Sequence, residues 1–369
     1  MGQRFDTRRL AVTRAFQARL AARGSVQAPK DPRRILVAHN LLLGDTLMLT
    51  PLLAKLRMKH PKADIALLAN PAFVPLYSGR PYGARALPFT PHAAETTRAV
   101  LAEPAFDMAI VAGDNRYAWL AAAAGARHIV AHAGDTPWTK SWFVDDQRPY
   151  SATPTAWGDS VAELVDGPDA QPFRASDWPA PAAAPFDAPS KPYAVLHVGA
   201  STPLKLWLPE RWKALAHELV ARGLEVVWGA GRGEESIIAA CDPEGRFASY
   251  AGRLNLAQLW HLLKGASLLV APDTGVAHLG RTAFTPTVTL FGPGSAVICG
   301  PGRFWRDTPS RAVTIDPFPC RDQTILFRRD IAWVRRCGRS TAECAAPRCM
   351  HAIEVDAVLV AVDSLRGTP

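Results

Sequence analysis

The strongest constraint on the fold of this chain is an alternation of short apolar runs with amphipathic stretches, which recurs over most of its length. In the first half, four apolar runs are each short enough to form one buried strand. These predicted strands span residues 33–40, 63–70, 106–113 and 127–134. A predicted helix at 45–61 follows the first strand, and we expect Pro51 to bend its first turns. Strands that alternate with helices are typical of βαβ units and a parallel sheet.

A second alternating series follows a proline-rich segment at 150–192, which can sustain neither a helix nor a central strand. The predicted strands of this series span residues 191–199, 224–231, 267–273 and 285–293. Its predicted helices span residues 208–223, 233–241, 254–266 and 353–365, and a further helix is predicted to start at Gly275. Gly223 is placed to end the first of these helices.

We therefore expect an α/β protein with two Rossmann-like, doubly wound domains that face each other across a cleft, with ligands at the carboxyl ends of the strands. The length of 369 residues is ample for two such domains. The predicted segments are a basic amphipathic helix at 1–28, an N-terminal domain at 29–165, a Pro/Ala-rich linker at 166–190, a C-terminal domain at 191–350, and a closing helix with tail at 351–369.

The net charge of +9 favours an anionic partner, which could be nucleic acid, a phosphorylated substrate or an acidic membrane surface. No nucleic-acid-binding motif occurs, and no stretch interleaves basic with aromatic residues, which argues against nucleic acid. No run of about 18 apolar residues occurs, and arginines interrupt the N-terminus too often for a signal peptide. We therefore expect a cytoplasmic protein.

Residues 4–23 have the spacing of an amphipathic helix, with Val12, Phe16 and Leu20 on one face and arginines elsewhere. Such a helix can lie on the anionic cytoplasmic face of the inner membrane, which would make the protein peripheral to it. Alternatively, the helix packs on its own domain with its basic face in water. The sequence leaves both interpretations open.

Four of the six cysteines crowd toward the C-terminal end, namely Cys320, Cys337, Cys344 and Cys349. Their spacing, C-x16-C-x6-C-x4-C, contains no close C-x2-C pair and so matches no common zinc pattern. A metal site, disulfides and reduced packing cysteines all stay open, with reduced cysteines favoured in a cytoplasmic chain.

Several catalytic signatures are missing, which narrows the possible chemistry. The sequence has no G-x-x-x-x-G-K-[ST] loop, no G-x-S-x-G turn and no H-E-x-x-H helix. It also lacks the D-x-D pair on which metal-dependent sugar transfer commonly relies. Three strand-to-helix junctions carry polar residues instead.

The first junction is Leu43-Gly44-Asp45-Thr46, between the first predicted strand and its helix. Glycine allows a tight turn there, and the carboxylate of Asp45 would lie at the mouth of the cleft, where a general base could accept a proton. The alternative is that Asp45 only caps the helix, which aspartate does often.

The second junction runs from His197 to Pro209 and contains small and hydroxyl residues, including Ser201 and Thr202, followed by Lys205. Small residues let backbone N–H groups approach a phosphate, and the lysine ammonium can neutralise its charge. The alternative is an ordinary solvated lysine in a loop.

The third junction is Ala271-Pro-Asp273-Thr274-Gly275-Val-Ala-His278. A carboxylate and the free amides of a helix N-terminus lie next to each other here. This suits a sugar hydroxyl on Asp273 and a pyrophosphate on the helix dipole. The alternative is an N-cap aspartate with a packing histidine one turn later.

Together the three junctions resemble the lipopolysaccharide heptosyltransferases of glycosyltransferase family 9, over about residues 33–300. The most specific part is D-T-G-V-A-H-L followed by P-T-V-T-L-F-G-P, within residues 273–293. N-x-x-x-G-D-x-x-M-x-T-P at 40–51 and K-x-W-x-P at 205–209 match in the same order. The resemblance implies a GT-B fold with an N-terminal acceptor domain and a C-terminal nucleotide-sugar domain.

The resemblance also implies an activity and its residues. The enzyme would transfer heptose from ADP-heptose to an anionic glycolipid, the lipopolysaccharide core, with inversion and without a metal or other cofactor. Asp45 would be the base, in a turn with Asn40 and Gly44. On the donor side, Lys205 would act in catalysis, and the donor-binding residues would be Ser201, Thr202, Glu234, Asp273, Thr274, Gly275 and His278. The ribose ligand is ambiguous between Glu234 and its neighbour Glu235.

Two alternatives stay open at this point. One is a nucleotide-sugar 2-epimerase of the same architecture, which would turn over a nucleotide sugar with no acceptor present. The other is a non-catalytic relative that serves as a sugar-binding scaffold. The presence of Asp45, Lys205 and Asp273 argues against the scaffold.

Overall fold

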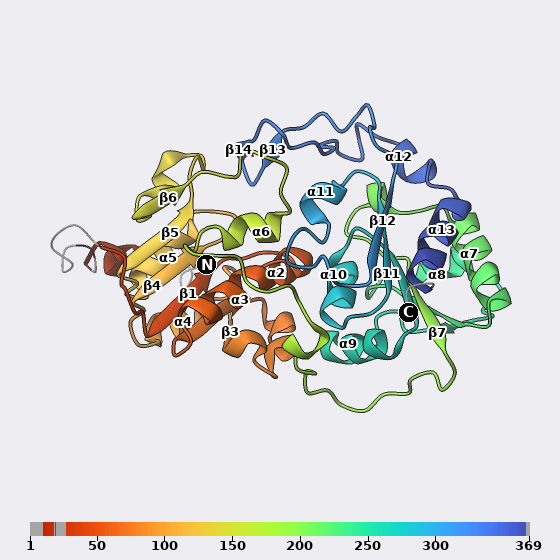
Figure 1. The fold of residues 1–369 in the computed structure, drawn as a ribbon, viewed down its shortest axis with the longest axis horizontal. Helices are drawn as coiled ribbons and strands as arrows, with labels where there is room; N and C mark the ends of the chain where they lie inside the picture. The colour runs from red at the N-terminus through yellow and green to blue at the C-terminus, as the bar shows by residue number, and fades with distance from the viewer. Residues whose placement is uncertain (1–9, 18, 20–26, 367–369) are drawn as a thin grey trace. The chain divides into compact units, whose positions relative to one another are not determined.

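The computed structural model describes residues 10–17, 19 and 27–366 of the 369-residue chain (Figure 1). The chain divides into two compact units. The N-terminal unit comprises Met1–Gln171 and Ile325–Trp333, and the C-terminal unit comprises Pro172–Thr324 and Val334–Pro369.

The N-terminal unit is built on a six-stranded sheet in which all neighbouring strands are parallel, in the order β3-β2-β1-β4-β5-β6. Its strands are β1 (Arg34–Ala38), β2 (Asp64–Ala69), β3 (Ala84–Pro88), β4 (Met108–Val111), β5 (His128–His132) and β6 (Asp146–Arg148). The four predicted strands of this half are confirmed as β1, β2, β4 and β5. The edge strands β3 and β6 are half-exposed and carry no continuous apolar run, so the sequence pattern misses them.

The helices of the N-terminal unit cover its sheet (Figure 1). They are α2 (Leu43–Leu47), α3 (Thr50–Lys59), α4 (Ala94–Ala102), α5 (Tyr117–Ala123) and α6 (Trp157–Ala162), with 3-10 turns η1 (Pro71–Tyr77), η2 (Pro81–Gly83) and η3 (Trp138–Ser141). The single bent helix predicted at 45–61 is in fact two helices, α2 and α3. Pro51 is the second residue of α3, where its missing N–H leaves no helical bond unmade.

Part of the predicted N-terminal helix lies in the described chain. Of the predicted segment 1–28, residues 10–17 and 19 are helical, residues 27 and 28 are described but not helical, and the rest lies outside the described residues. Ala15 is fully buried, Arg14 donates to the carbonyl of Leu101 at 2.9 Å, and Arg19 pairs with Asp145 at 2.7 Å. This helix therefore packs on its own unit, and Arg14 and Arg19 contact other residues of that unit.

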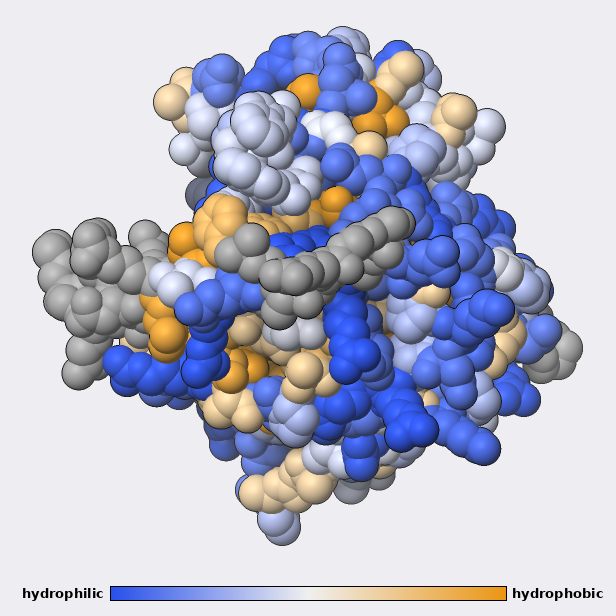
Figure 2. Space-filling model, turned by 90° about the vertical axis from the view of Figure 1, so that its left-hand side faces the viewer, coloured by the Kyte–Doolittle hydropathy of each residue, from blue (hydrophilic) through white to orange (hydrophobic). Residues whose placement is uncertain are grey.

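Exposed apolar side chains lie on this helix and in the segment that contacts it. They are Leu10, Val12 and Phe16 of the helix, and Trp138 and Trp142 of the neighbouring segment. The rings of Phe16 and Trp138 lie 6.0 and 5.5 Å from that of Trp142. Figure 2, which views the side of the N-terminal unit, shows apolar patches on a largely hydrophilic surface. None of the helices in the described part of the chain has the length and apolarity needed to cross a membrane.

The C-terminal unit repeats the same sheet plan, in the order β12-β11-β10-β7-β8-β9, again with parallel neighbours. Its strands are β7 (Tyr193–His197), β8 (Glu225–Gly229), β9 (Ala248–Ser249), β10 (Leu268–Pro272), β11 (Thr287–Phe291) and β12 (Ser310–Thr314). Its helices are α7 (Pro209–Ala221), α8 (Glu235–Cys241), α9 (Leu256–Gly265), α10 (Gly275–Thr282), α11 (Ala296–Cys299), α12 (Arg348–His351) and α13 (Val355–Arg366), with 3-10 turns η4 (Ala175–Asp177) and η5 (Pro203–Lys205). The predicted α/β class with two Rossmann-like sheets is therefore confirmed.

The sequence marks helix ends in this unit clearly. Pro209 is the first residue of α7, and Gly223 adopts φ 81° just beyond its end, the left-handed conformation that glycine allows at a helix C-terminus. Asn255 accepts a hydrogen bond from the amide of Gln258, whose side chain accepts one in return, and this capping box starts α9.

One short segment joins the N-terminal unit from late in the sequence. It is the antiparallel hairpin of β13 (Ile325–Leu326) and β14 (Arg329–Asp330), within residues 325–333. These residues fall inside the segment predicted as the C-terminal domain, 191–350, and the chain on both sides of them belongs to the C-terminal unit. The hairpin is bound through Arg329, whose buried side chain bonds the ends of β4 and β5.

Candidate functional site

Both units have one point at which the chain reverses its direction across the sheet. The adjacent strands there are β1 and β4 in the N-terminal unit and β7 and β10 in the C-terminal unit. Loops that leave two such strands turn toward opposite sides, and open parallel sheets bind ligands between them. The three junctions singled out in the sequence follow β1, β7 and β10, so each lies at one of these switch points.

Asp45 is the third residue of α2 and is half-buried in its first turn. The N-cap position belongs to Leu42, whose side chain makes no capping bond. The interpretation of Asp45 as the helix cap is therefore wrong, although its charge suits the positive end of the helix dipole. Gly44 precedes it within the turn, and Asn40 is exposed two residues after β1.

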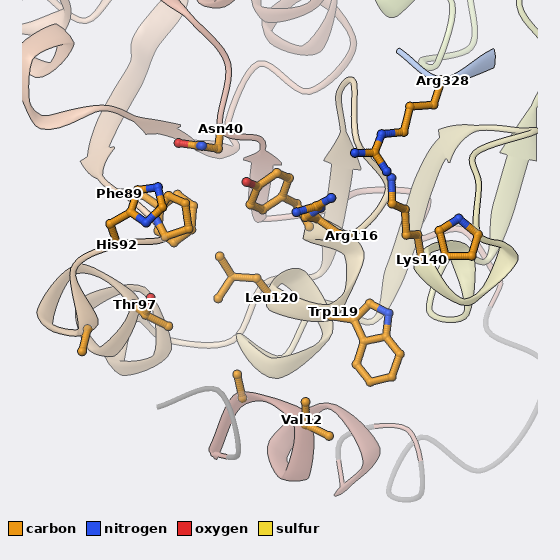
Figure 3. Close-up of a pocket in the computed structure, with 15 residues that line it drawn as sticks. Val12, Asn40, Phe89, His92, Thr97, Arg116, Trp119, Leu120, Lys140 and Arg328 are labelled. Atoms are coloured by element: carbon orange, nitrogen blue, oxygen red, sulfur yellow. The ribbon is translucent and has the colours of Figure 1, made fainter. Parts of the chain in front are cut away.

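A cavity of about 770 Å³ opens beside this junction, with Asn40 on its wall. Its lining includes the apolar residues Val12, Phe89, Trp119 and Leu120 and the basic residues Arg116, Lys140 and Arg328. Figure 3 shows the three basic side chains on one side of the cavity and Phe89, His92 and Thr97 on the other. The cavity therefore pairs an apolar wall with a basic one.

Two of the three cations already have carboxylate partners. Lys140 is buried, and its ammonium lies 3.1 Å from Asp114 and 3.0 Å from Asp135. Arg116 is more exposed and lies 2.9 Å from the other oxygen of Asp114. These carboxylates fix the two cations in place while reducing their net charge.

The second and third junctions meet in the C-terminal unit. The ammonium of Lys205 donates to the backbone carbonyl of Asp273 at 2.6 Å and to its carboxylate at 3.0 Å. The lysine side chain is 24% exposed and that of Asp273 only 7%. Lys205 is therefore fixed across the switch point between β7 and β10, with one N–H left for a ligand.

The start of α10 is open beside this pair. Thr274 is its N-cap residue but makes no capping bond, and its buried hydroxyl has no hydrogen-bond partner in the described structure. Gly275 is the first helical residue, so its amide and that of Val276 have no acceptor within the helix, whereas the amide of Ala277 donates to the carbonyl of Thr274. A β-carbon at Gly294 would collide with the carboxylate of Asp273, so glycine is needed there. Unpaired donors beside a lysine form a ready anion site.

The remaining predicted donor-side residues lie around the ends of β7 and β8. Glu234 accepts hydrogen bonds from the amides of Ala200 at 3.1 Å and Gly231 at 2.6 Å and so joins the two loops. The carboxylate of Glu235 turns instead to the amide of Gly233.

Ser201 is exposed in the loop after β7. Thr202 accepts from the amide of Leu204 at 3.4 Å and caps η5, whose last residue is Lys205. These hydroxyls therefore belong to the loop that carries the lysine.

His278 lies within α10, one turn after its start, and is buried. Burial, together with the charges of Arg281 and Lys205, holds its pKa well below the usual value, so the ring is neutral near pH 7. Its Nδ1 lies 3.3 Å from the guanidinium of Arg281, which also donates to the carbonyl of Cys299. These contacts fit a packing role for His278 as well as the predicted donor role.

The four clustered cysteines line a second cavity, of about 240 Å³, in the C-terminal unit. All are free thiols. Within the described residues, no group of three or more His, Cys, Asp or Glu side chains has the spacing of a metal site.

Sequence reasoning missed the basic wall of the larger cavity. Arg116 follows β4, a predicted strand, so the rule that ligands bind at the carboxyl ends of strands could have found it. Lys140 lies in a 3-10 turn and Arg328 at the tip of a two-residue hairpin loop, and neither position carries a local sequence signal.

A buried histidine lies at the end of the first strand of each sheet: His39 directly follows β1, and His197 is the last residue of β7. Burial lowers the pKa of His39 to about 3 and that of His197 to about 4. Both rings therefore stay neutral beneath the loops that carry Asp45 and Lys205.

Because both histidines are buried in the neutral form, the folded protein should lose stability in acid. A histidine whose folded pKa lies below its unfolded value of about 6.5 gives full stability above pH 6.5, and that stability is lost as pH falls toward the folded pKa. For His197 alone, urea unfolding should show a loss of about 1.5 kcal/mol between pH 6.5 and pH 5. His197→Gln should remove that part of the pH dependence, whereas His92→Gln, at an exposed position, should not. An unchanged slope in His197→Gln would contradict the assignment.

Known proteins resemble this chain in sequence and fold. The model of glycosyltransferase family 9 (heptosyltransferase) matches residues 96–317. Lipopolysaccharide heptosyltransferase 1 of Pseudomonas aeruginosa is 35% identical over 155 residues, which cover 38% of this chain and 42% of that protein. The chain matches less than half the length of this relative and of the other curated heptosyltransferases 1 that it resembles.

Among solved structures, the Escherichia coli heptosyltransferase WaaC with ADP-2-deoxy-2-fluoro heptose has a TM-score of 0.66 at 17% identity, over 90% of this chain and 99% of that one. The iron-containing dodecameric glycosyltransferase TibC of enterotoxigenic E. coli has a TM-score of 0.56 at 16% identity, over 92% and 80%. At these identities the structures establish a shared fold, which is that of GT-B heptosyltransferases. The family model spans more than half of the 369 residues, and the chain therefore belongs to glycosyltransferase family 9, the heptosyltransferase family.

Proposed function

We propose that this protein is an inverting glycosyltransferase that moves heptose from ADP-heptose to a lipopolysaccharide core, with no metal in the chemical step. The observation that carries the proposal is the Lys205–Asp273 pair beside the open start of α10, at the switch point of the C-terminal sheet. The family and the ADP-sugar complex of WaaC support the same donor.

On the donor side, the pyrophosphate would bind the free amides at Thr274 and Gly275, and Lys205 would give it a third donor. Asp273 would accept hydrogen bonds from sugar hydroxyls. Glu234, rather than Glu235, would bind the ribose, because its carboxylate lies between the loops that follow β7 and β8. The carboxylate of Asp273 keeps Lys205 in place before the donor arrives.

On the acceptor side, Asp45 would be the general base. The acceptor oxygen attacks the anomeric carbon as the bond from that carbon to the phosphate oxygen breaks, and the acceptor proton passes to the carboxylate of Asp45. ADP leaves with the bonding electrons. One displacement of this kind inverts the anomeric centre.

Charge on the departing phosphate must be stabilised for this step to proceed. Lys205 and the amides of α10 provide fixed positive charge at that point, as a metal does in other transferases. The step proposed here therefore uses only side chains and backbone of the chain. The cysteines that line the second cavity have no role in it.

If Asp45 is the base and Lys205 binds the donor, substitutions of these two residues should affect different properties: turnover in the first case and ADP affinity in the second. Asp45→Asn should lower turnover about 100-fold or more, since it removes the proton acceptor, and should leave ADP affinity unchanged. Lys205→Ala should weaken ADP binding about tenfold or more, because it removes a charged hydrogen-bond donor. Sugar transfer and ADP calorimetry would measure the two effects.

The control is Asp31→Asn, the same chemical change at an exposed position of the N-terminal unit. Near wild-type turnover in Asp45→Asn would reject Asp45 as the base. Turnover of ADP-heptose without an acceptor would instead favour an epimerase.

We also propose peripheral contact with the anionic cytoplasmic face of the inner membrane, through the surface formed by Val12, Phe16, Trp138 and Trp142. Trp138 is 69% and Trp142 54% exposed, and tryptophan favours the boundary between water and lipid. The protein would then meet a lipid-linked acceptor at the surface that contacts the membrane.

Membrane contact predicts that Trp138→Ala weakens sedimentation with vesicles of phosphatidylglycerol and phosphatidylethanolamine several-fold. Val360→Ala, at a 70% exposed position of α13, should bind the vesicles like wild type. Equal losses in both variants, or none in either, would contradict this surface as the contact.

A further inference from the structure

The tip of the β13–β14 hairpin has an unfavourable backbone. Its two loop residues, Phe327 and Arg328, have φ of 46° and 65°. A two-residue loop with both φ values positive has the pattern of a type I′ turn, which favours Asn-Gly. Left-handed backbone costs roughly 1 kcal/mol or more for a residue with a β-carbon. The strain indicates that these side chains are needed where they are.

Hydrogen bonds of the neighbouring residue Arg329 stabilise the hairpin tip and offset this strain. Its guanidinium donates to the carbonyls of Gly113 at 2.7 Å, His132 at 3.1 Å and Ala133 at 2.8 Å, and to the side chain of Asn115 at 2.8 Å. These groups lie at the carboxyl ends of β4 and β5. A buried guanidinium bonded on all sides leaves the hairpin little freedom to shift.

The ring of Phe327 adds a second contact on the same side. It packs 4.8 Å from that of Trp157, centre to centre. A β-carbon at Gly113 would touch both this ring and Leu41, which follows β1. The tip is therefore packed against the exits of β1 and β4, next to the loop that leads to Asp45.

Arg328 points from this fixed tip to the cavity beside Asn40 (Figure 3). It is exposed, and its side chain makes no hydrogen bond or ion pair with any residue that the structure describes. Arg116 and Lys140 on the same wall already share Asp114. Of these three cations, Arg328 is thus the one whose charge is left for a ligand.

We propose that Arg328 recognises an anionic group, a phosphate or carboxylate, of an amphipathic acceptor whose apolar part lies on Phe89, Trp119 and Leu120. This deepens the proposed function, because it rests on the acceptor binding in the N-terminal unit. The hairpin makes the site specific, since its strained tip and buried anchor hold one guanidinium at the edge of an otherwise neutralised wall.

Calorimetry with octyl phosphate tests the inference on the full chain. Octyl phosphate carries both parts of the proposed ligand, octanol lacks the charge and inorganic phosphate lacks the chain. We expect octyl phosphate to bind more tightly than either. Arg328→Gly should raise its Kd about tenfold, and Arg328→Lys should recover part of the loss. Octanol binding should be equal in all variants.

Arg328→Gly also separates binding from folding. Glycine adopts φ 65° without strain, so the thermal midpoint should equal or exceed that of the wild type. The matched control is Arg80→Gly. Arg80 also has positive φ, 52°, lies in the same unit and is 58% exposed, but it does not line the cavity. It should bind octyl phosphate like wild type.

Unchanged octyl phosphate affinity in Arg328→Gly would overturn the proposal, as would octanol binding as tightly as octyl phosphate. A transfer assay distinguishes this from failure of the proposed function. If wild type transfers sugar and Arg328→Gly keeps the same acceptor KM, only the role of Arg328 fails. If wild type transfers no sugar, the proposed function fails, and calorimetry still decides whether the cavity binds the amphiphile.

Discussion

Parallel strands can be joined only by crossovers that run over a face of the sheet, and this constraint decides where polar groups collect in both units. From β1 the chain builds outward to β3, returns to pair β4 with β1, and then builds outward on the other side to β6. The C-terminal sheet follows the same course from β7 to β12. The loops after the two central strands therefore diverge, and the helices after them begin with unpaired amides. Asp45 and the Lys205–Asp273 pair both occupy such places.

The two switch points differ in the charge they carry. In the C-terminal unit, Lys205 and the start of α10 present positive charge with one nearby carboxylate, which suits a pyrophosphate. In the N-terminal unit, a half-buried carboxylate lies in the turn after β1, and the cavity beside it has a basic wall. This difference supports a division of labour in which one unit binds the donor and the other supplies the base.

Much of this arrangement could be predicted from the sequence, because it rests on local patterns. Apolar runs located β1 and β7, Pro209 and Gly223 marked the ends of α7, and the D-T-G motif located the start of α10. The break between α2 and α3 was predicted only as a bend. Pro51 does lie in the first turn of a helix, as predicted, but periodicity alone does not distinguish one bent helix from two separate helices.

The missed features depend on contacts between distant residues. Arg329 donates to the carbonyls of Gly113 and His132, and no residue near it in the sequence indicates these contacts. The same is true of Arg328, which reaches the cavity only because Arg329 fixes the hairpin. Local spacing also could not decide whether Asp45 caps its helix, since the outcome depends on Leu42 taking the N-cap position.

The central claim is that ADP binds the C-terminal switch point alone, and hydrogen exchange of the full chain with and without ADP tests it most directly. If ADP binds there, exchange should slow at the loops after β7, β8 and β10, which are residues 198–205, 230–235 and 273–279. Exchange at residues 39–46 and 112–117 should not change. Slower exchange in those N-terminal loops, with or without slowing in the C-terminal ones, would contradict ADP binding at the C-terminal switch point alone.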